Sequence, residues 1–150
     1  MIPAEKFELL KSQLEGDLFT DNVQRILYST DASSYKEKPL AVTRPKSASD
    51  VEKILAFARE HKTSVIPRAG GTSLAGQVVG SGLVVDVSKY MNRILDFNKD
   101  EHWVWVEPGV IPAELNKWLA PHGLQFGPET STANRCCVGG MLGNNSCGLH

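Results

Sequence analysis

The 150-residue sequence contains no apolar run that approaches the roughly 18–20 residues of a membrane span. Its first residues, MIPAEKFELLKSQLEG, are acidic and amphipathic, unlike the basic and then apolar layout of a secretory signal peptide. The lysines and arginines are scattered and the formal net charge is only -1. A broad nucleic-acid surface needs a clustered cationic footprint, so no nucleic-acid partner is expected.

Cysteine is scarce, and its three residues, Cys136, Cys137 and Cys147, all lie in one glycine-rich segment. An odd, clustered set is not a disulfide framework, which favours a reducing cytoplasm. Together with His150 these thiols would make poor zinc geometry, so no metal site is predicted. A thiol nucleophile formed by Cys147 and His150 is conceivable, but small apolar cysteines beside a cofactor are the favoured interpretation.

What remains is an ordinary globular composition, with 41% hydrophobic and 22% charged residues. The length suits one domain or part of a larger one. The sequence stops at NNSCGLH, within glycine-dense text, whereas domains more usually end on an exposed helix or tail. We therefore expect an N-terminal piece of a longer protein.

The first half of the sequence predicts helices that alternate with short strands. A helix is expected over residues 3–15, with a stripe of Phe7, Leu10 and Leu14, and a shorter one over residues 21–28. The polar stretch TDASSYKEKP reads as a loop, and LAVTRP as a strand that ends near Pro45.

The next helix is predicted over SASDVEKILAFAREH. Ser49 and Glu52 form its expected capping box. One face of this helix is expected to carry Val51, Ile54, Leu55 and Ala58.

Further strands are expected at SVIP, GLVVDVS, RILDFN and HWVWVEPG, the last two as a hairpin, followed by a helix over about residues 111–120. Trp103, Trp105 and Trp118 are interpreted as core or domain-contact residues. The order of elements indicates a mixed α+β fold.

The most informative stretch is the glycine-rich loop PRAGGTSLAGQ, residues 67–77. Glycine lets backbone amides approach phosphate oxygens and turn toward them, and Arg68 could add a charge-assisted bond. No lysine follows the glycines and no G-x-G-x-x-G opens a helix, so neither a Walker loop nor a Rossmann site is predicted. Taken alone, the loop could equally be a tight turn between strands.

A second segment, residues 127–148, is also rich in glycine and in hydrogen-bonding side chains. Polar groups at such density need partners, and a large polar ligand would supply them. VGGMLGNN could form one or two helical turns whose first amides attract an anion. Two donor-rich segments suit a dinucleotide better than a single phosphate. Glu129 and Arg135 are either site residues or solvated loop charges.

These motifs together resemble a known family. PRAGGTSLAG, LVVDVSKYMNRIL, VWVEPGVIPAELNKWLAPHGLQFGPET and CVGGMLGNNSCG are similar to the N-terminal half of the FAD-linked oxidases, whose flavin domain is of the PCMH/VAO type. The branch they resemble is that of D-lactate dehydrogenase, glycolate oxidase and D-2-hydroxyglutarate dehydrogenase. The resemblance implies residues 25–150 as the N-terminal part of a PCMH-type FAD-binding domain, including the start of its second subdomain, after a helical segment over residues 1–24.

The resemblance also implies which residues hold FAD. The glycine loop would bind the pyrophosphate, the PET turn would line the flavin, and the last segment would meet the flavin ring and the rest of the dinucleotide. The implied cofactor residues are Pro67, Arg68, Ala69, Gly70, Gly71, Thr72, Ser73, Gly76, Gln77, Pro128, Glu129, Thr130, Cys137, Gly139, Gly140, Asn144, Asn145 and Ser146. Thr72 stands where covalently flavinylated relatives have histidine, so non-covalent FAD is expected.

The implied reaction is oxidation of a D-2-hydroxy acid to the 2-oxo acid, with the catalytic base and the substrate ligands outside this sequence. Other alcohols or sugars, or a non-catalytic nucleotide-binding module, are the alternatives. Electrons would leave through a downstream iron–sulfur region, a quinone or an electron-transfer protein. We expect a cytoplasmic protein, associated with a membrane only through such a partner, and homodimerisation through an exposed apolar face.

Overall fold

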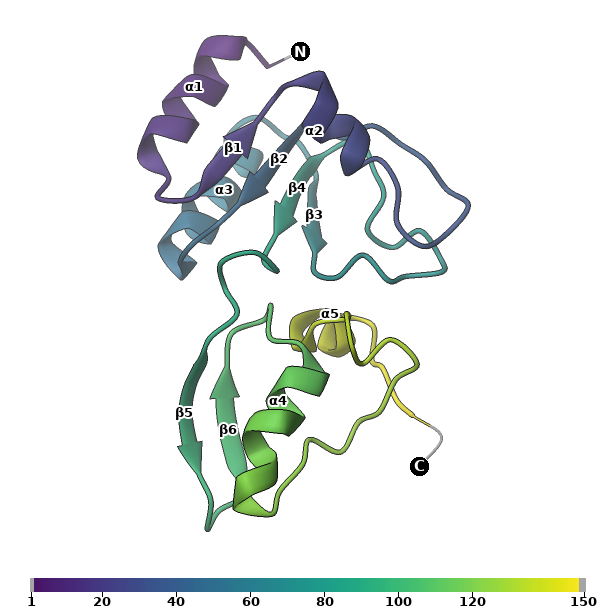
Figure 1. The fold of residues 1–150 in the computed structure, drawn as a ribbon. Coiled ribbons are helices and arrows are strands. Elements are labelled where there is room, and N and C mark those ends of the chain that lie inside the picture. Colours follow the sequence, from purple (N-terminus) through teal and green to yellow (C-terminus); the bar gives the residue numbers. More distant parts are fainter. Residues whose placement is uncertain (1, 149–150) are drawn as a thin grey trace.

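The computed structural model describes residues 2–148, which form two lobes (Figure 1). The first lobe consists of α1 (Ala4–Gln13), β1 (Asp17–Phe19), α2 (Asn22–Leu27), β2 (Ala41–Arg44), α3 (Ala48–Glu60), β3 (Val65–Arg68) and β4 (Leu83–Asp86). The second consists of β5 (Ile94–Asn98), β6 (Trp103–Val106), α4 (Pro112–Leu119), the 3-10 turn η1 (Ala120–His122) and α5 (Val138–Gly143). The α+β class is confirmed.

The first lobe is built on a four-stranded sheet in the order β1-β2-β4-β3. Strand β1 runs antiparallel to β2, whereas β2, β4 and β3 are parallel, with Val84 opposite both Val42 and Ile66. Parallel strands place their carboxyl ends at one edge, which is where ligands bind in open α/β sheets. Arg68 and Asp86 are register partners at that edge.

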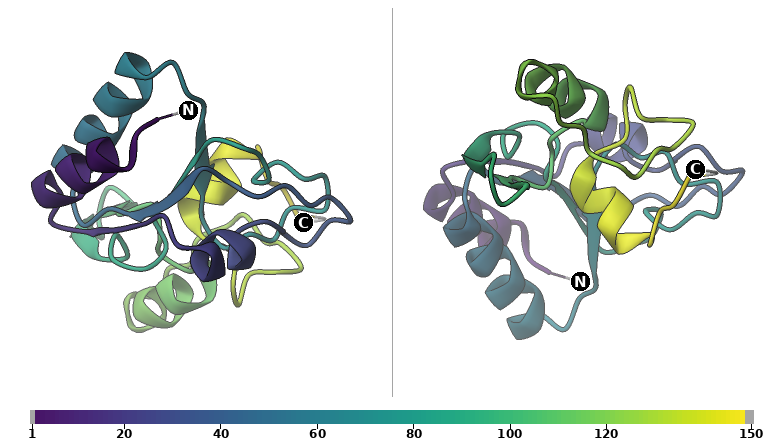
Figure 2. Two further views of the ribbon diagram at one scale, coloured as in Figure 1. Left: turned by 90° about the horizontal axis from the view of Figure 1, so that it is seen from above. Right: turned by 90° about the horizontal axis from the view of Figure 1, so that it is seen from below.

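Helices α1 and α3 cover one face of this sheet, and α2 lies on the other (Figure 2). The two central strands are buried on both faces, which is why apolar residues follow one another without alternation at Ala41 and Val42 and over residues 83–85. Phe7 of α1 and Phe57 of α3 pack with ring centroids 5.4 Å apart above Leu83 and Val85. A separate cluster on the other face is formed by Val42, Ile66 and Val84.

The predicted start of α3 was wrong by two residues. Ser47, not Ser49, is the N-cap, and its side chain accepts a hydrogen bond from the Asp50 amide. The buried face therefore carries Asp50, Ile54, Phe57 and Ala58, whereas Leu55 is exposed. Among the described residues the Asp50 carboxylate accepts from the Lys46 amide and not from that of Ser47, so only the serine half of a capping box forms.

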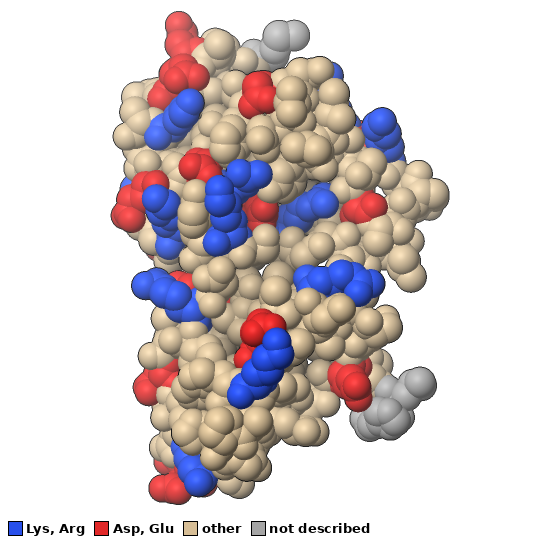
Figure 3. Space-filling view, in the orientation of Figure 1, with Lys and Arg blue, Asp and Glu red and all other residues tan. Residues whose placement is uncertain are grey.

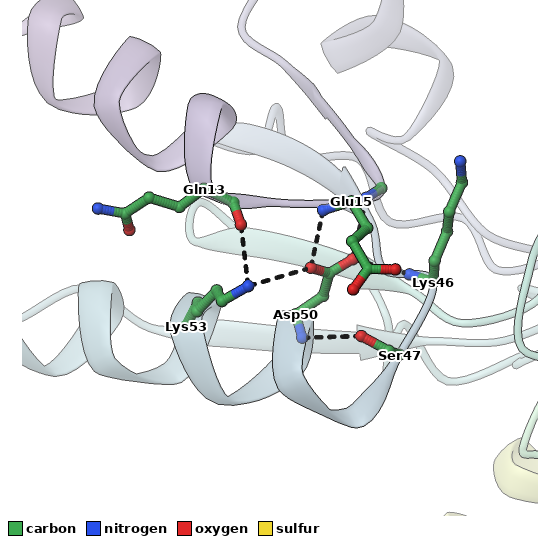
Figure 4. Close-up of polar contacts among 7 residues, drawn as sticks. Gln13, Glu15, Lys46, Ser47, Asp50 and Lys53 are labelled. Carbon is green, nitrogen blue, oxygen red and sulfur yellow. Dashed lines mark hydrogen bonds and ion pairs between the residues drawn. The ribbon is translucent and has the colours of Figure 1, made fainter.

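Asp50 is a fully buried carboxylate that ties the start of α3 to the turn before β1 (Figure 4). Its oxygens accept from the backbone amides of Glu15, Gly16 and Lys46 at 2.9, 2.9 and 3.0 Å. The Nζ atom of Lys53, one turn along α3, is 3.9 Å from Oδ1 of Asp50. Three amide donors to one charge are a strong local clamp.

The second lobe packs the antiparallel β5–β6 hairpin against α4. Val110, Leu115 and Leu119 form its buried core. Trp105 is 65% exposed and points away from that core, so of the two predicted roles, core or domain contact, only domain contact stays a prediction for it. Trp118 is also exposed and stacks edge-on against Phe97, with centroids 5.0 Å apart. Within residues 2–148, no helix combines the length and apolarity that crossing a membrane requires.

Candidate functional site

The glycine loop leaves the sheet at the carboxyl end of β3, as predicted, and stays non-helical over residues 69–82. Gly71 and Gly76 adopt positive φ angles of 63° and 70°, which only glycine takes at low cost. The amides of Gly71, Thr72 and Ser73 donate to no acceptor among the described residues. This turn therefore presents three consecutive backbone donors that remain free for a ligand.

Side chains of the glycine loop bond within the loop and stabilise its turn. The Ser73 hydroxyl donates to Oε1 of Gln77 at 2.8 Å and accepts from the Ala75 amide at 3.1 Å. It also accepts from the Gln77 amide at 3.4 Å. Ser73 and Gln77, both predicted cofactor residues, thus contact each other and stabilise the turn.

Arg68 does not point freely into solvent. Its guanidinium donates to the Thr30 carbonyl oxygen at 2.8 Å and lies over the Tyr28 ring at 5.1 Å. A Cβ atom at Gly71 would lie only 2.6 Å from its Nη2 atom. The cation is therefore held directly against the glycine loop, where it raises the local positive potential.

The second segment folds back to the same place through α5, confirming the predicted helical turns. Cys136 and Cys137 are buried, and the Cys136 thiol lies 3.3 Å from the Thr130 hydroxyl. The first two amides of α5 are already used, because Val138 and Gly139 donate to the carbonyls of Val110 and Pro108. The predicted anion-attracting helix end is thus largely occupied by backbone contacts.

The two segments touch, and glycines make the contact. A Cβ at Gly70 would lie 2.5 Å from the Arg135 carbonyl oxygen, and one at Gly140 would lie 3.1 Å from Cβ of Ala69. Burial raises the pKa of Cys137 to about 11, with smaller contributions from Cys136 and Asp86. That thiol is therefore protonated and inert at neutral pH, consistent with the packing role expected for it.

The other predicted residues border this contact. One group is exposed and so accessible to a ligand: Pro67, Gly70, Gln77, Pro128, Glu129, Gly140, Asn144 and Asn145. Ser146 is half-buried and accepts a weak bond from the Asn144 side chain at 3.5 Å. Arg135 is exposed; its guanidinium donates to Oδ1 of Asn134 at 2.9 Å and its backbone amide to the Thr132 carbonyl at 2.8 Å. His150, considered with Cys147 as a thiol pair, lies outside the described residues.

Sequence reasoning missed a polar network beneath the site. Asp86 is buried at the end of β4, where its Oδ2 accepts from the Tyr28 hydroxyl at 2.6 Å. Its Oδ1 accepts from both the amide and the hydroxyl of Ser88. Arg44 in turn donates to the Tyr28 hydroxyl oxygen at 3.0 Å. A charged residue inside the apolar run LVVDVS was a readable signal, because buried carboxylates need partners.

The comparisons with known proteins agree with this geometry. A family described as "FAD binding domain" matches residues 39–150, and the chain belongs to that family. The D-2-hydroxyglutarate dehydrogenase of Escherichia coli is 42% identical over 94% of this chain, and the glycolate oxidase subunit GlcD of Bacillus subtilis 33% identical over 85%. The matched regions make up 14% and 28% of those relatives, so the chain spans a minor part of their length.

Solved structures extend the likeness to the fold. An alkyldihydroxyacetonephosphate synthase superposes on 99% of this chain with a TM-score of 0.86 at 23% identity, over 30% of its own length. A 4-ethylphenol oxidase from Gulosibacter chungangensis superposes on 81% of this chain, and on 26% of its own, with a TM-score of 0.66 at 25% identity. These neighbours confirm the PCMH-type domain fold.

The residues present fit FAD. Its pyrophosphate needs several donors within one short stretch, and Gly71, Thr72 and Ser73 provide three unpartnered amides there. Side chains would block the approach at Gly70 and Gly140, where the two segments meet. FAD is accordingly the cofactor of this domain.

Proposed function

We propose that this chain supplies the first part of the FAD-binding domain of a flavin-dependent oxidoreductase that acts on a D-2-hydroxy acid. The observation that carries the proposal is that the amides of Gly71, Thr72 and Ser73 have no acceptor within residues 2–148. They lie where the glycine loop touches residues 135–140 and beside the fixed cation of Arg68. Such a set matches a diphosphate, which carries negative charge and many acceptor oxygens.

Each part of the site has an assigned role in this proposal. The glycine loop binds the pyrophosphate through backbone donors, and the exposed turn from Pro128 to Thr130 borders the flavin. Gly139 and Gly140, which are half-buried and exposed, provide a close, small-residue surface for the ring beside the buried Cys137, while residues 144–146 contact the rest of the dinucleotide. Thr72 has no nucleophilic imidazole, so the cofactor is held without a covalent bond.

When bound, FAD supplies the two-electron acceptor for oxidation of an alcohol carbon. The chain's own contribution is to bind and orient the cofactor with preformed donors, so that little conformational freedom is lost on binding. In the proposed reaction the C–H bond of the hydroxy acid supplies a hydride equivalent and its O–H proton goes to a base outside this chain. The electrons then pass to an iron–sulfur cluster, a quinone or an electron-transfer protein.

The test is spectroscopic and uses the protein expressed from its complete gene. We expect a yellow protein whose flavin absorbance is bleached anaerobically by D-2-hydroxyglutarate, D-lactate or glycolate, and the fastest of these three identifies the substrate. Bleaching only by another alcohol or a sugar would retain the flavoenzyme and overturn the substrate class. A colourless protein that takes up no added FAD would refute the proposal entirely.

A substitution at Gly71 tests the assignment of the loop. Gly71→Ala should reduce FAD content by at least about tenfold, because alanine at φ 63° distorts the three donors. The matched control is Gly123→Ala, since Gly123 has a φ of 73° with nothing within 4 Å of its Cβ position. Both variants carry the same backbone strain, so equal losses of flavin would show that the loop is not the binding site.

A further inference from the structure

A third segment lies against the glycine loop. Residues 28–35, named here the bracing loop, follow α2 and run side by side with residues 69–80 in Figure 1 and in both views of Figure 2. Sequence reasoning treated this stretch as a simple connection. Its contacts with the glycine loop are specific hydrogen bonds and ring contacts.

The contacts run along the whole length of both loops. The Ala32 amide donates to the Gly71 carbonyl oxygen at 3.2 Å, directly at the turn with positive φ. The Tyr35 ring lies so close to Gly76 that a Cβ there would be 2.6 Å from it. Tyr35 and Ala75 also line a pocket of about 280 Å³ between the two segments. Both positive-φ glycines of the glycine loop, Gly71 and Gly76, are thus held by the bracing loop.

Arg68 is clamped by the same segment. The Tyr28 ring covers its guanidinium at 5.1 Å, and the Thr30 carbonyl accepts from it at 2.8 Å. Asp31 adds a negative charge that attracts Arg68, and its Oδ1 accepts from the Ser33 amide at 2.8 Å. A cation restricted in this way can act on a neighbouring anion without first losing side-chain freedom.

Tyr28 itself is anchored to the sheet. Its hydroxyl donates to the buried Asp86 carboxylate at 2.6 Å, at the carboxyl end of β4. We propose that the bracing loop positions the glycine loop for the cofactor, with Tyr28 as the positioning residue for Arg68. This inference rests on the proposed function, because it assigns cofactor affinity to residues that act through Arg68 and the glycine loop.

The chain offers a closely matched control in Tyr90. Its hydroxyl donates to the Asp17 carboxylate at 2.9 Å, and Lys46 and Lys89 lie over its ring at 5.1 and 4.9 Å. Tyr28 and Tyr90 therefore make the same kinds of contact in the same lobe. Tyr90 makes them near β1, while Tyr28 makes them beside the glycine loop.

The experiment measures the FAD dissociation constant by titrating the apo-form of the protein expressed from its complete gene. Tyr28→Leu loses both the ring and the hydroxyl and should weaken FAD binding about tenfold, whereas Tyr28→Phe keeps the ring over Arg68 and should weaken it about two- to threefold. Tyr90→Leu and Tyr90→Phe should leave the FAD dissociation constant unchanged, even where they lower the melting temperature by as much as the Tyr28 substitutions do.

Tyr35→Ala provides a second route should Tyr28→Leu fail to fold, because Tyr35 is 62% exposed and its removal spares the core. It should weaken FAD binding about fivefold by loosening the turn at Gly76. Wild-type affinity in Tyr28→Phe and Tyr35→Ala, or equal losses at Tyr28 and Tyr90, would overturn the inference. An absence of FAD binding in the wild type would instead refute the proposed function, and this inference with it.

Discussion

The two lobes differ in how their strands are covered. In the first lobe the central strands are closed on both faces, and Val42, Leu83 and Val84 are entirely buried. In the second lobe the hairpin is covered on one face only, so that Leu95 and Trp105 are 55% and 65% exposed. A two-stranded sheet gains independent stability only by packing on something else, and here that partner is α4.

Gly109 and Arg93 make close contacts at the boundary between the two lobes. The Gly109 amide donates to the Met91 carbonyl at 2.7 Å, and a Cβ there would lie 2.5 Å from the Val87 carbonyl oxygen. Arg93 grips the buried Glu107 carboxylate at 2.7 Å across the base of the hairpin. Lysine and arginine side chains gather in the middle band of this face, where the lobes meet (Figure 3). The cofactor segments lie at that same boundary.

The largest stability difference between the lobes is expected at their buried carboxylates. Asp50→Ala should lower the free energy of unfolding by about 2–4 kcal/mol, because three backbone amides lose a charged acceptor inside the core. Glu107→Ala should cost less, since its partner Arg93 is 68% exposed and can turn to water. Urea unfolding at pH 7 measures both.

Asp100→Ala is the control, because Asp100 lies in the exposed β5–β6 turn and, in the part of the chain that the structure describes, bonds only through its backbone amide. It should change the free energy by less than about 0.5 kcal/mol. A loss at Glu107 as large as that at Asp50 would mean that the second lobe is as tightly clamped as the first.

Protonation of Asp50 in acid should also lower the free energy of unfolding, but by less than Asp50→Ala does. Burial alone would raise the pKa of Asp50, but the amides of Lys46, Glu15 and Gly16 outweigh it and hold the pKa below its ordinary 3.8. A depressed folded-state pKa stabilises the fold above the unfolded value, and this stabilisation is lost as the pH falls through the folded value. Between pH 5 and pH 2.5 the free energy of unfolding should therefore fall less for Asp50→Asn than for the wild type. Parallel curves would exclude Asp50 as the source.

The fold was largely readable because its signals are local. Apolar runs predicted β2 and β4, and helical spacing predicted α1, α3 and α4, all of which the structure confirms. The errors came from choices that local patterns leave open. Two serines could cap α3, and only the contact of Asp50 with Glu15, 35 residues away, decides between them. The exposure of Trp105 likewise depends on which face of the hairpin α4 covers.

The candidate site was readable in part for the same reason. Glycine patterns identified both segments, since close approach requires the absence of a side chain at Gly70 and Gly140. The contact of the bracing loop with Gly71 was not readable, because it joins ordinary loop residues that lie about 40 positions apart. The role of Tyr28 follows only from tertiary structure, where Asp86 and Arg68 approach it from two different strands.

The smallest expected effect tests the open face of the second lobe. Trp105→Thr should change the unfolding free energy of this chain by less than about 0.5 kcal/mol, because the ring is mostly in water and threonine suits a strand. Val104→Thr, on the opposite face against α4, should cost about 1 kcal/mol, since it places a hydroxyl in an apolar cluster. The same urea experiment measures both. Equal losses at the two neighbours would show that both faces of the hairpin are covered, and the contrast between the lobes would disappear.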